Sequence, residues 1–314
     1  MQIIREAGNF QPASGGRIYL ALGNFDGIHI GHQRLIKEMV SRARRDGAQT
    51  AAFIFEPHPA RVLAPENAPR LLVSADRKAE LLAELGLDVL IYHSFTPAIA
   101  RCSPREFVKQ ILLDCLGVSA AFVGFNYSFG HKGVGTPDRL KELGTEYGFS
   151  VYVQSAVTIA DRVVSSSQIR EYLEEGRVKE ATAMLGYPPM LEGLVAEGEK
   201  RGRTIGFPTA NLEINPELVL PATGVYAAWA ALGDSIHPAV INIGQKPTFH
   251  QEYPLSVEAH LIDFDQEIYS QHLRILLYQR LRGEKRFNSV EALVAQITSD
   301  RETARQLLGK AGEE

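Results

Sequence analysis

The sequence has little of what marks secreted or membrane proteins. It has two cysteines, Cys102 and Cys115, and we expect both in one helix. Thirteen helical residues span roughly 20 Å, too far for a disulfide, so the pair indicates reduced thiols in a cytoplasmic protein. No run reaches the ~18 apolar residues of a membrane helix. Residues 1–10 (MQIIREAGNF) lack the apolar core and cleavage site of a signal peptide.

The sequence also lacks a surplus of positive charge. It has 33 Lys and Arg against 37 Asp and Glu, a net charge of −4. This argues against broad nucleic-acid binding and leaves room for a local basic pocket that takes a nucleotide. The hydrophobic content of 45 % is typical of a globular protein, and 314 residues are enough for two domains. We expect small molecules as partners, without nucleic acid or membrane; the sequence leaves a homo-oligomer open.

The common phosphate-binding motifs are missing as well. Neither G-x-G-x-x-G nor G-x-x-x-x-G-K-[ST] occurs. In their place stands GNFDGIHIGH at residues 23–32, between an apolar run at 18–22 and an amphipathic helix. The unpaired N–H groups and the dipole of a helix start together favour an anion. His29 and His32 lie on one face of that helix, and their ring N–H groups add donors suited to a nucleotide phosphate.

The first half of the chain alternates between strand-like and helix-like runs. Further strands are predicted at residues 50–55, 89–93, 118–125 and 149–157, and helices begin after Ser74, Ser103 and Thr136. This order predicts a doubly wound parallel sheet with helices on both faces, in a domain covering residues 1–186. Ligands of such sheets bind beyond the carboxyl ends of the strands, where residues 23–32, 56–59 and 123–136 should meet.

Two segments at that edge carry candidate binding residues. Residues 123–136 (VGFNYSFGHKGVGT) combine glycines with aromatics, which suits a planar ring system stacked on Tyr127 or Phe129; Phe125 is left open between core and ligand. Residues 165–170 (SSSQIR) precede a helix and are ordinarily caps. Arg170, however, falls in the first turn, where a cation is unfavourable unless it meets a phosphate. Arg162 is a further candidate for the ATP side.

The pattern changes after residues 186–189 (GYPP). Short strand-like runs with Gly and Pro between them predict a small antiparallel barrel followed by a helix at 289–308, in a domain covering residues 187–314. Residues 202–212 (GRTIGFPTANL) open this half. Gly202 and Gly206 allow close backbone approach to a phosphate. Thr209 and Asn211 place a hydroxyl and an amide oxygen on one side of an extended chain, which suits Mg²⁺.

These motifs carry a specific resemblance. GNFDGIHIGH resembles the HxGH signature of the nucleotidyltransferase superfamily in the form found in bacterial FAD synthetases. Residues 202–212 resemble the riboflavin kinase signature. Segments 221–227, 242–249 and 257–269 match the same kinase family in order, and 282–287 is a looser match. The chain is thereby similar to bifunctional riboflavin kinase/FMN adenylyltransferases. The resemblance implies a multifunctional transferase that phosphorylates riboflavin to FMN with ATP and Mg²⁺, then adenylylates FMN to FAD.

The resemblance also implies roles for individual residues. The catalytic residues would be His29, His32 and Arg170 for adenylyl transfer and Glu258 as the base of the kinase. ATP and its phosphates would be bound by Gly23, Phe25, Asp26, Gly27, Gly31, Arg162, Ser166, Ser167, Gly202 and Gly206. Asn126, Tyr127 and Phe129 would bind flavin, and Thr209 and Asn211 the metal. Ser167, Lys246 and Ser270 stand where the family usually has Thr, Arg and Gly.

Other functions remain open at this point. A flavin-binding regulator built on a silent enzyme, or a kinase-only enzyme, would keep the same fold. Against the first, both histidines, Thr209, Asn211 and Glu258 are all present. The N-terminal half could also adenylylate another phosphate, such as a pantetheine or nicotinamide nucleotide. The attached kinase half argues against that because it supplies FMN.

Overall fold

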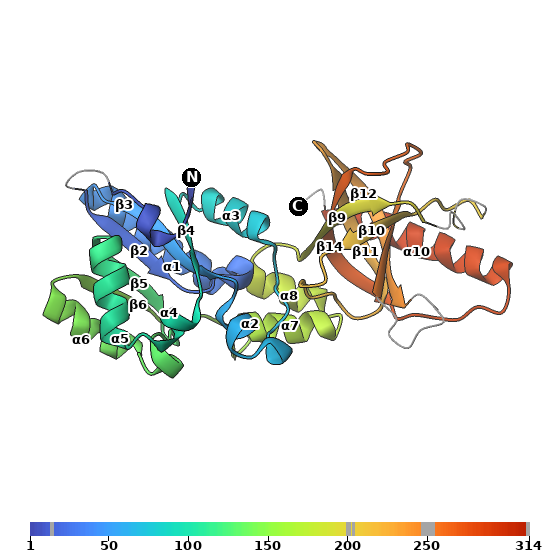
Figure 1. The fold of residues 1–314 in the computed structure, drawn as a ribbon. Helices are drawn as coiled ribbons and strands as arrows, with labels where there is room; N and C mark the ends of the chain where they lie inside the picture. Colours follow the sequence, from blue (N-terminus) through green and yellow to red (C-terminus); the bar gives the residue numbers. More distant parts are fainter. Residues whose placement is uncertain (13–15, 199–201, 203–204, 246–254, 312–314) are drawn as a thin grey trace. The chain divides into compact units, whose positions relative to one another are not determined.

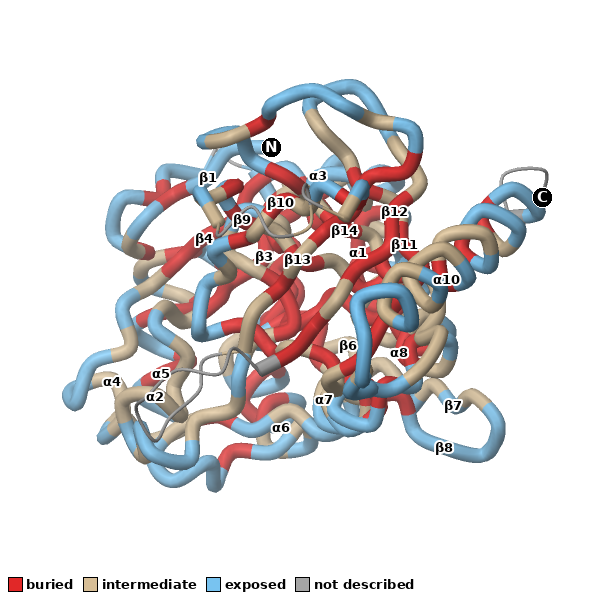
Figure 2. The backbone as a smooth tube through the Cα atoms, turned by 90° about the vertical axis from the view of Figure 1, so that its right-hand side faces the viewer, coloured by how far each residue is buried: buried red, intermediate tan, exposed pale blue. Residues whose placement is uncertain are grey.

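The computed structural model describes residues 1–12, 16–198, 202, 205–245 and 255–311. It divides into two compact units, Met1–Ser166 and Ser167–Glu314. The division falls at the start of α7 (Ser166–Glu174), so α7 and α8 (Val178–Leu185) count mainly with the second unit. The sequence instead predicts a domain boundary at residue 186, and that boundary stays a prediction. Buried residues gather in the strands and exposed ones in the loops (Figure 2).

The first unit is built on a sheet of six parallel strands in the order β1-β4-β3-β2-β5-β6 (Figure 1). The strands are β1 (Gln2–Arg5), β2 (Ile18–Leu22), β3 (Gln49–Glu56), β4 (Val89–Ser94), β5 (Val118–Gly124) and β6 (Ser150–Gln154). The chain runs from β2 out to β4 and then returns to β5 on the other side of β2. The crevice between β2 and β5 is therefore the topological switch point, where such sheets bind ligands.

Helices join these strands, and the predicted caps are present. They are α1 (Ile30–Asp46), α2 (Pro59–Leu63), α3 (Ala75–Glu84), α4 (Pro97–Arg101), α5 (Pro104–Phe107), a π-helix (Val108–Cys115) and α6 (Pro137–Tyr147). Ser74, Ser103 and Thr136 each accept a backbone N–H at a helix start. A small hairpin, β7 (Thr158–Ile159) and β8 (Arg162–Val163), follows the sheet.

The prediction that both cysteines share one helix is wrong. Cys102 is the C-cap of α4, and the capping box of Ser103 and Glu106 starts a new helix that continues to Cys115. The capping box breaks the segment because Ser103 can cap only the helix that follows it. Both thiols are nevertheless free.

The second unit contains a closed antiparallel barrel in the order β10-β13-β12-β11-β14-β9. Its strands are β9 (Met190–Ala196), β10 (Ala210–Ile214), β11 (Gly224–Leu232), β12 (Ser235–Gln245), β13 (Leu255–Leu261) and β14 (His272–Arg282). Tyr226 and Ile241 lie among the residues that fill the interior. Helix α10 (Val290–Ala311) buries Ala304 and Leu308 against Val225 and Val240 on the outer face. The predicted fold class is confirmed for both halves.

Candidate active sites

The turn that follows β2 has an unusual backbone. Phe25 takes φ 47°, Gly27 φ 75° and Ile28 φ 35°, all in the left-handed region. Helix α1 then begins at Ile30, with His29 as its N-cap. The structure thus places residues 23–32 at the switch point, as predicted, with the N-terminus of α1 directed at it.

His29 and His32 form a stacked pair. The ring centroids are 3.6 Å apart and the planes 15° apart, while Phe25 meets His32 edge-on at 5.2 Å. The His29 Nδ1 atom accepts the backbone N–H of His32 at 3.3 Å. A Cβ on Gly31 would lie 3.2 Å from the His29 ring, so glycine leaves room for this stack.

Burial keeps both rings neutral. Loss of solvent lowers the pKa of His29 from its ordinary value to about 4 and the pKa of His32 well below its usual range. Because Nδ1 of His29 accepts a hydrogen bond, its proton sits on Nε2. The pair can therefore donate hydrogen bonds to an anion without carrying charge of its own.

Other polar groups fix the turn from behind. The Asp26 carboxylate, 3 % exposed, accepts the Leu72 N–H at 3.0 and 3.2 Å. The Ser166 hydroxyl donates to the Asp26 carbonyl at 2.9 Å. In this arrangement both side chains, for which the resemblance implies phosphate binding, hold the turn in shape.

The segment after β3 converges on the same turn, as expected for residues 56–59. Asn24 Nδ2 lies 2.9 Å from His58 Nε2. Lys78 of α3 donates from Nζ to the Asn24 carbonyl at 3.0 Å, and the lysine is only 8 % exposed. Sequence reasoning missed Lys78, although its spacing from Leu81 and Leu82 matches the buried face of α3.

The aromatic loop after β5 is arranged differently from the expectation. Phe129 is 6 % exposed, packs on Phe107 at 5.8 Å and stacks on Tyr127 at 5.6 Å. Its backbone pairs with Gly135 through two hydrogen bonds. The exposed ring of the loop is Phe125, at 46 %, and Asn126 beside it is exposed too. The Phe129 ring thus packs in the core, and Phe125 and Asn126 present the loop to solvent.

The remaining predicted ATP-side residues lie after the sheet. Arg162 is on the exposed strand β8, while Ser167 and Arg170 are on α7. Ser167 is exposed and Arg170 is half-buried.

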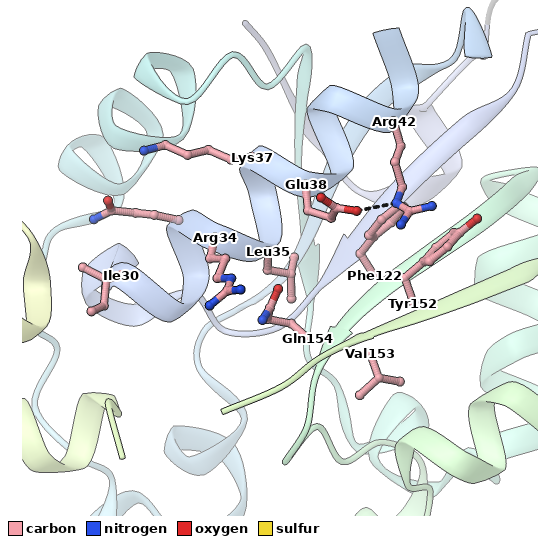
Figure 3. A pocket seen from close by; sticks show the side chains of 11 residues that line it. Ile30, Arg34, Leu35, Lys37, Glu38, Arg42, Phe122, Tyr152, Val153 and Gln154 are labelled. Atoms are coloured by element: carbon pink, nitrogen blue, oxygen red, sulfur yellow. Dashed lines mark hydrogen bonds and ion pairs between the residues drawn. The ribbon is translucent and has the colours of Figure 1, made fainter. Parts of the chain in front are cut away.

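A pocket of about 780 Å³ runs along α1 (Figure 3). Ile30 and Gln33 line it at the start of α1, next to the histidine pair, and Phe122 and Gln154 line it from β5 and β6. Arg42 forms an ion pair with Glu38 and lies 4.4 Å from the centre of the Tyr152 ring at the far end. The volume is within the range of roughly 300–1,000 Å³ for small-molecule sites.

A polar row crosses the barrel in the second unit. Glu258 on β13 stands opposite Asn211 of β10 and opposite Asn242 of β12. Residues that pair directly across antiparallel strands share one face, so the carboxylate lies between two amides. Val257 and Ala259, on the other face, are buried in the barrel interior. This arrangement matches the outward-facing Glu258 that alternation predicts.

The residues before Asn211 are held by His260. Its Nδ1 lies 2.9 Å from the Pro208 carbonyl, and because a carbonyl only accepts, Nδ1 carries the proton. Its ring meets Phe207 edge-on at 5.4 Å, and burial lowers its pKa. Gly202 packs tightly here, since a Cβ would lie 2.3 Å from the Phe207 carbonyl.

Two residues near the row were missed from the sequence. Asn242 could be placed next to Glu258 only from the strand register, in which the two residues pair directly. Glu284 follows β14, and its Oε1 would lie 2.5 Å from a Cβ on Gly244, so its carboxylate sits against that strand. Lys246 is outside the described residues.

Comparison with known proteins identifies both halves. The FAD synthetase family model matches residues 11–168 and the riboflavin kinase model residues 185–308. A bifunctional riboflavin kinase/FMN adenylyltransferase of Listeria monocytogenes is 39 % identical over 93 % of this chain and 92 % of the relative. The chain belongs to the bifunctional riboflavin kinase/FMN adenylyltransferase family. Its counterpart in Escherichia coli K12 is 34 % identical over 98 % of both chains.

A solved structure has the same fold over the whole length. It is described as a macrolide-efflux protein from Streptococcus pneumoniae, and it matches with a TM-score of 0.88 and 29 % identity over 97 % of this chain and 99 % of that one. This match supports the fold of this chain. The efflux activity belongs to that protein's description and carries over nothing to this chain. Across the described residues, no helix has the length and apolar character to cross a membrane.

The metal-binding prediction of the riboflavin kinase half can be tested against the donor set. Among the residues that the structure describes, no three His, Cys, Asp or Glu side chains come together as metal ligands. Mg²⁺ keeps several waters and takes few protein ligands besides substrate phosphates. The hydroxyl of Thr209 and the amide of Asn211 fit that mode of binding.

Proposed function

We propose that this chain makes FAD from riboflavin in two ATP-dependent steps, each at its own site. One observation carries the proposal: the FAD synthetase match covers strands β2 to β6 and the stacked histidines, and the riboflavin kinase match covers the barrel with Glu258. The barrel phosphorylates riboflavin to FMN. The sheet unit transfers AMP from ATP to FMN and releases pyrophosphate.

Riboflavin phosphorylation needs a base, because the ribityl 5′-hydroxyl is a poor nucleophile until its proton leaves. Glu258 fills that role, since its carboxylate lies in the polar row with Asn211 and Asn242. Thr209 and Asn211 would hold Mg²⁺, and the ion would supply positive charge to the transferred phosphate. His260 holds the Pro208 carbonyl and so keeps Thr209 and Asn211 in position.

Adenylyl transfer needs no base, because the FMN phosphate is already ionised. The site has to align that phosphate with the α-phosphorus of ATP and stabilise the leaving pyrophosphate. His29 and His32 donate ring N–H groups, and the backbone around Gly23, Gly27 and Gly31 adds further donors. Arg162, Ser167 and Arg170 assist on the phosphate side.

The two substrates of adenylyl transfer take different sides of the switch point. The pocket along α1 begins at Ile30 and Gln33, beside the histidine pair, and takes the nucleotide. The loop after β5 takes the flavin through Asn126, with the Tyr127 ring backed by Phe129. Phe125 adds the exposed aromatic surface of that loop.

The whole proposal is tested by incubating the pure protein with riboflavin, ATP and Mg²⁺ and separating the products by chromatography. We expect FMN first and FAD after it. FMN without FAD, also when FMN is supplied directly, would contradict adenylyl transfer and leave a kinase-only enzyme. The absence of any product would favour a silent flavin-binding protein.

We also propose a cytoplasmic location. ATP as substrate and two free thiols are in keeping with it.

A further inference from the structure

Lys78 is a buried cation to which no step of the proposed chemistry assigns a role. It lies on α3, is 8 % exposed, and donates from Nζ to the Asn24 carbonyl at 3.0 Å. An ammonium group removed from water is unfavourable unless paired, and an apolar side chain at this position of α3 would avoid that penalty. The burial of a lysine here therefore calls for a functional reason.

The surroundings of Lys78 connect it to the phosphate turn. Burial lowers the pKa of Lys78, and the carboxylates of Asp26 and Glu56 act in the opposite direction by favouring its charged form. The positive charge of Lys78 in turn helps to lower the pKa of His32. The ammonium is thus close enough to act electrostatically on His32 while it is hydrogen-bonded to the turn.

The neutral histidines leave a task for such a charge. His29 and His32 can donate hydrogen bonds, yet neither supplies positive charge at neutral pH. Pyrophosphate gains negative charge as it leaves, and fixed positive charge next to that position lowers the barrier. Lys78 sits behind the turn, held by the Asn24 carbonyl, and needs no rearrangement to provide it.

We propose that Lys78 is a positioning residue of adenylyl transfer: it fixes the Asn24 peptide of the turn through its hydrogen bond and places its positive charge near His32. The inference rests on the proposed function of the sheet unit. It concerns catalysis by that unit alone and leaves riboflavin phosphorylation unaffected.

The full-length protein allows charge, hydrogen bond and packing to be separated. Lys78→Met removes both charge and donor, Lys78→Gln keeps a donor without charge, and Lys78→Arg keeps the charge. Lys141→Met is the matched control, because Lys141 is a half-exposed lysine of α6 paired only with Asp138 among the described residues. FAD formation from FMN and ATP and FMN formation from riboflavin are measured for each variant.

We expect Lys78→Met and Lys78→Gln to lower kcat of FAD formation by about tenfold to a hundredfold, with little change in KM for FMN. Lys78→Arg and Lys141→Met should stay near the wild-type rate. Wild-type kcat in Lys78→Gln would overturn the charge role, and equal losses in Lys78→Arg and Lys78→Met would reduce Lys78 to a packing residue. Absence of FAD formation in the wild type would instead refute the proposed function.

Titration of His32 gives a readout that does not depend on turnover. Removing the nearby positive charge should raise the pKa of His32 in Lys78→Gln, seen as a shifted imidazole titration by NMR, and Lys78→Arg should leave it near the wild-type value. An unchanged His32 titration in a folded Lys78→Gln protein would contradict the electrostatic coupling.

Discussion

The Nδ1 atom of His29 accepts the backbone N–H of His32, and the two rings stack with their centroids 3.6 Å apart. One contact therefore does two things: it caps α1 and it fixes the proton of His29 on Nε2. The same hydrogen bond therefore stabilises the start of α1 and sets the Nε2–H donor of the proposed adenylyl-transfer site.

Removing either ring should stop FAD formation. We predict that His29→Ala and His32→Ala abolish adenylylation of FMN and leave riboflavin phosphorylation near the wild-type rate. Because loss of an N-cap costs about 1 kcal/mol, His29→Asn serves as control: asparagine restores the cap and should recover the stability but not the activity. Recovery of FAD formation in His29→Asn would show that His29 acts only as a cap.

Glu258 should give the reverse pattern. We predict that Glu258→Gln loses FMN formation by a large factor, because the amide cannot take the proton of the ribityl hydroxyl. The same variant should still convert supplied FMN to FAD. Full riboflavin kinase activity in a folded Glu258→Gln protein would refute the base assignment.

The buried histidine makes stability depend on pH. The pKa of His29 is about 4 in the folded chain and about 6.5 when the chain is unfolded, so the unfolded state binds more protons between these values. The free energy of unfolding should therefore be fully developed above about pH 6.5 and fall as the pH drops toward 4, by up to about 3 kcal/mol.

Urea unfolding at pH 5 and pH 7.5 measures this effect. The difference between the two pH values should shrink in His29→Asn, because that variant has no imidazole to protonate at this position. An equal difference in wild type and variant would mean that other groups cause it.

Phe125 and Phe129 form a matched pair with opposite expectations. Phe129→Ala should destabilise the sheet unit by about 3–5 kcal/mol, as expected for loss of a buried ring. Phe125→Ala should change stability by less than about 0.5 kcal/mol and raise KM for FMN in adenylyl transfer. Thermal unfolding and steady-state kinetics distinguish them, and a large loss of stability in Phe125→Ala would contradict its exposed position.

The sequence predicted those parts of the fold that depend on local patterns. The bounds of β2 and the amphipathic helix after residues 23–32 were predicted correctly, because hydrophobic periodicity and turn residues determine them. Strand β1 was missed, since only Ile4 of its four residues is buried and an edge strand needs no apolar run. Local sequence pattern predicts such a strand poorly, because its conformation depends on pairing with the neighbouring strand β4.

The candidate sites likewise combine features that local sequence pattern predicts with features that depend on the tertiary structure. GNFDGIHIGH indicated an anion site, yet the stacking and neutrality of the histidines follow from burial, which needs the tertiary structure. Asn242 joined Glu258 only through the strand register, a long-range property. Phe129, expected to stack on a ligand, is buried because the Phe129–Gly135 pairing turns the loop back onto the core, and Phe125, which the sequence left open, is exposed.

The central claim is that one chain holds two separate sites for consecutive reactions, and mixing two variants tests it most directly. Glu258→Gln and His32→Ala are incubated separately and together with riboflavin, ATP and Mg²⁺, and the flavins are separated by chromatography. We predict no FAD from either variant alone and FAD from the mixture, because FMN made by one is adenylylated by the other. A mixture that makes FMN but no FAD, while Glu258→Gln converts supplied FMN, would contradict separate sites linked by free FMN.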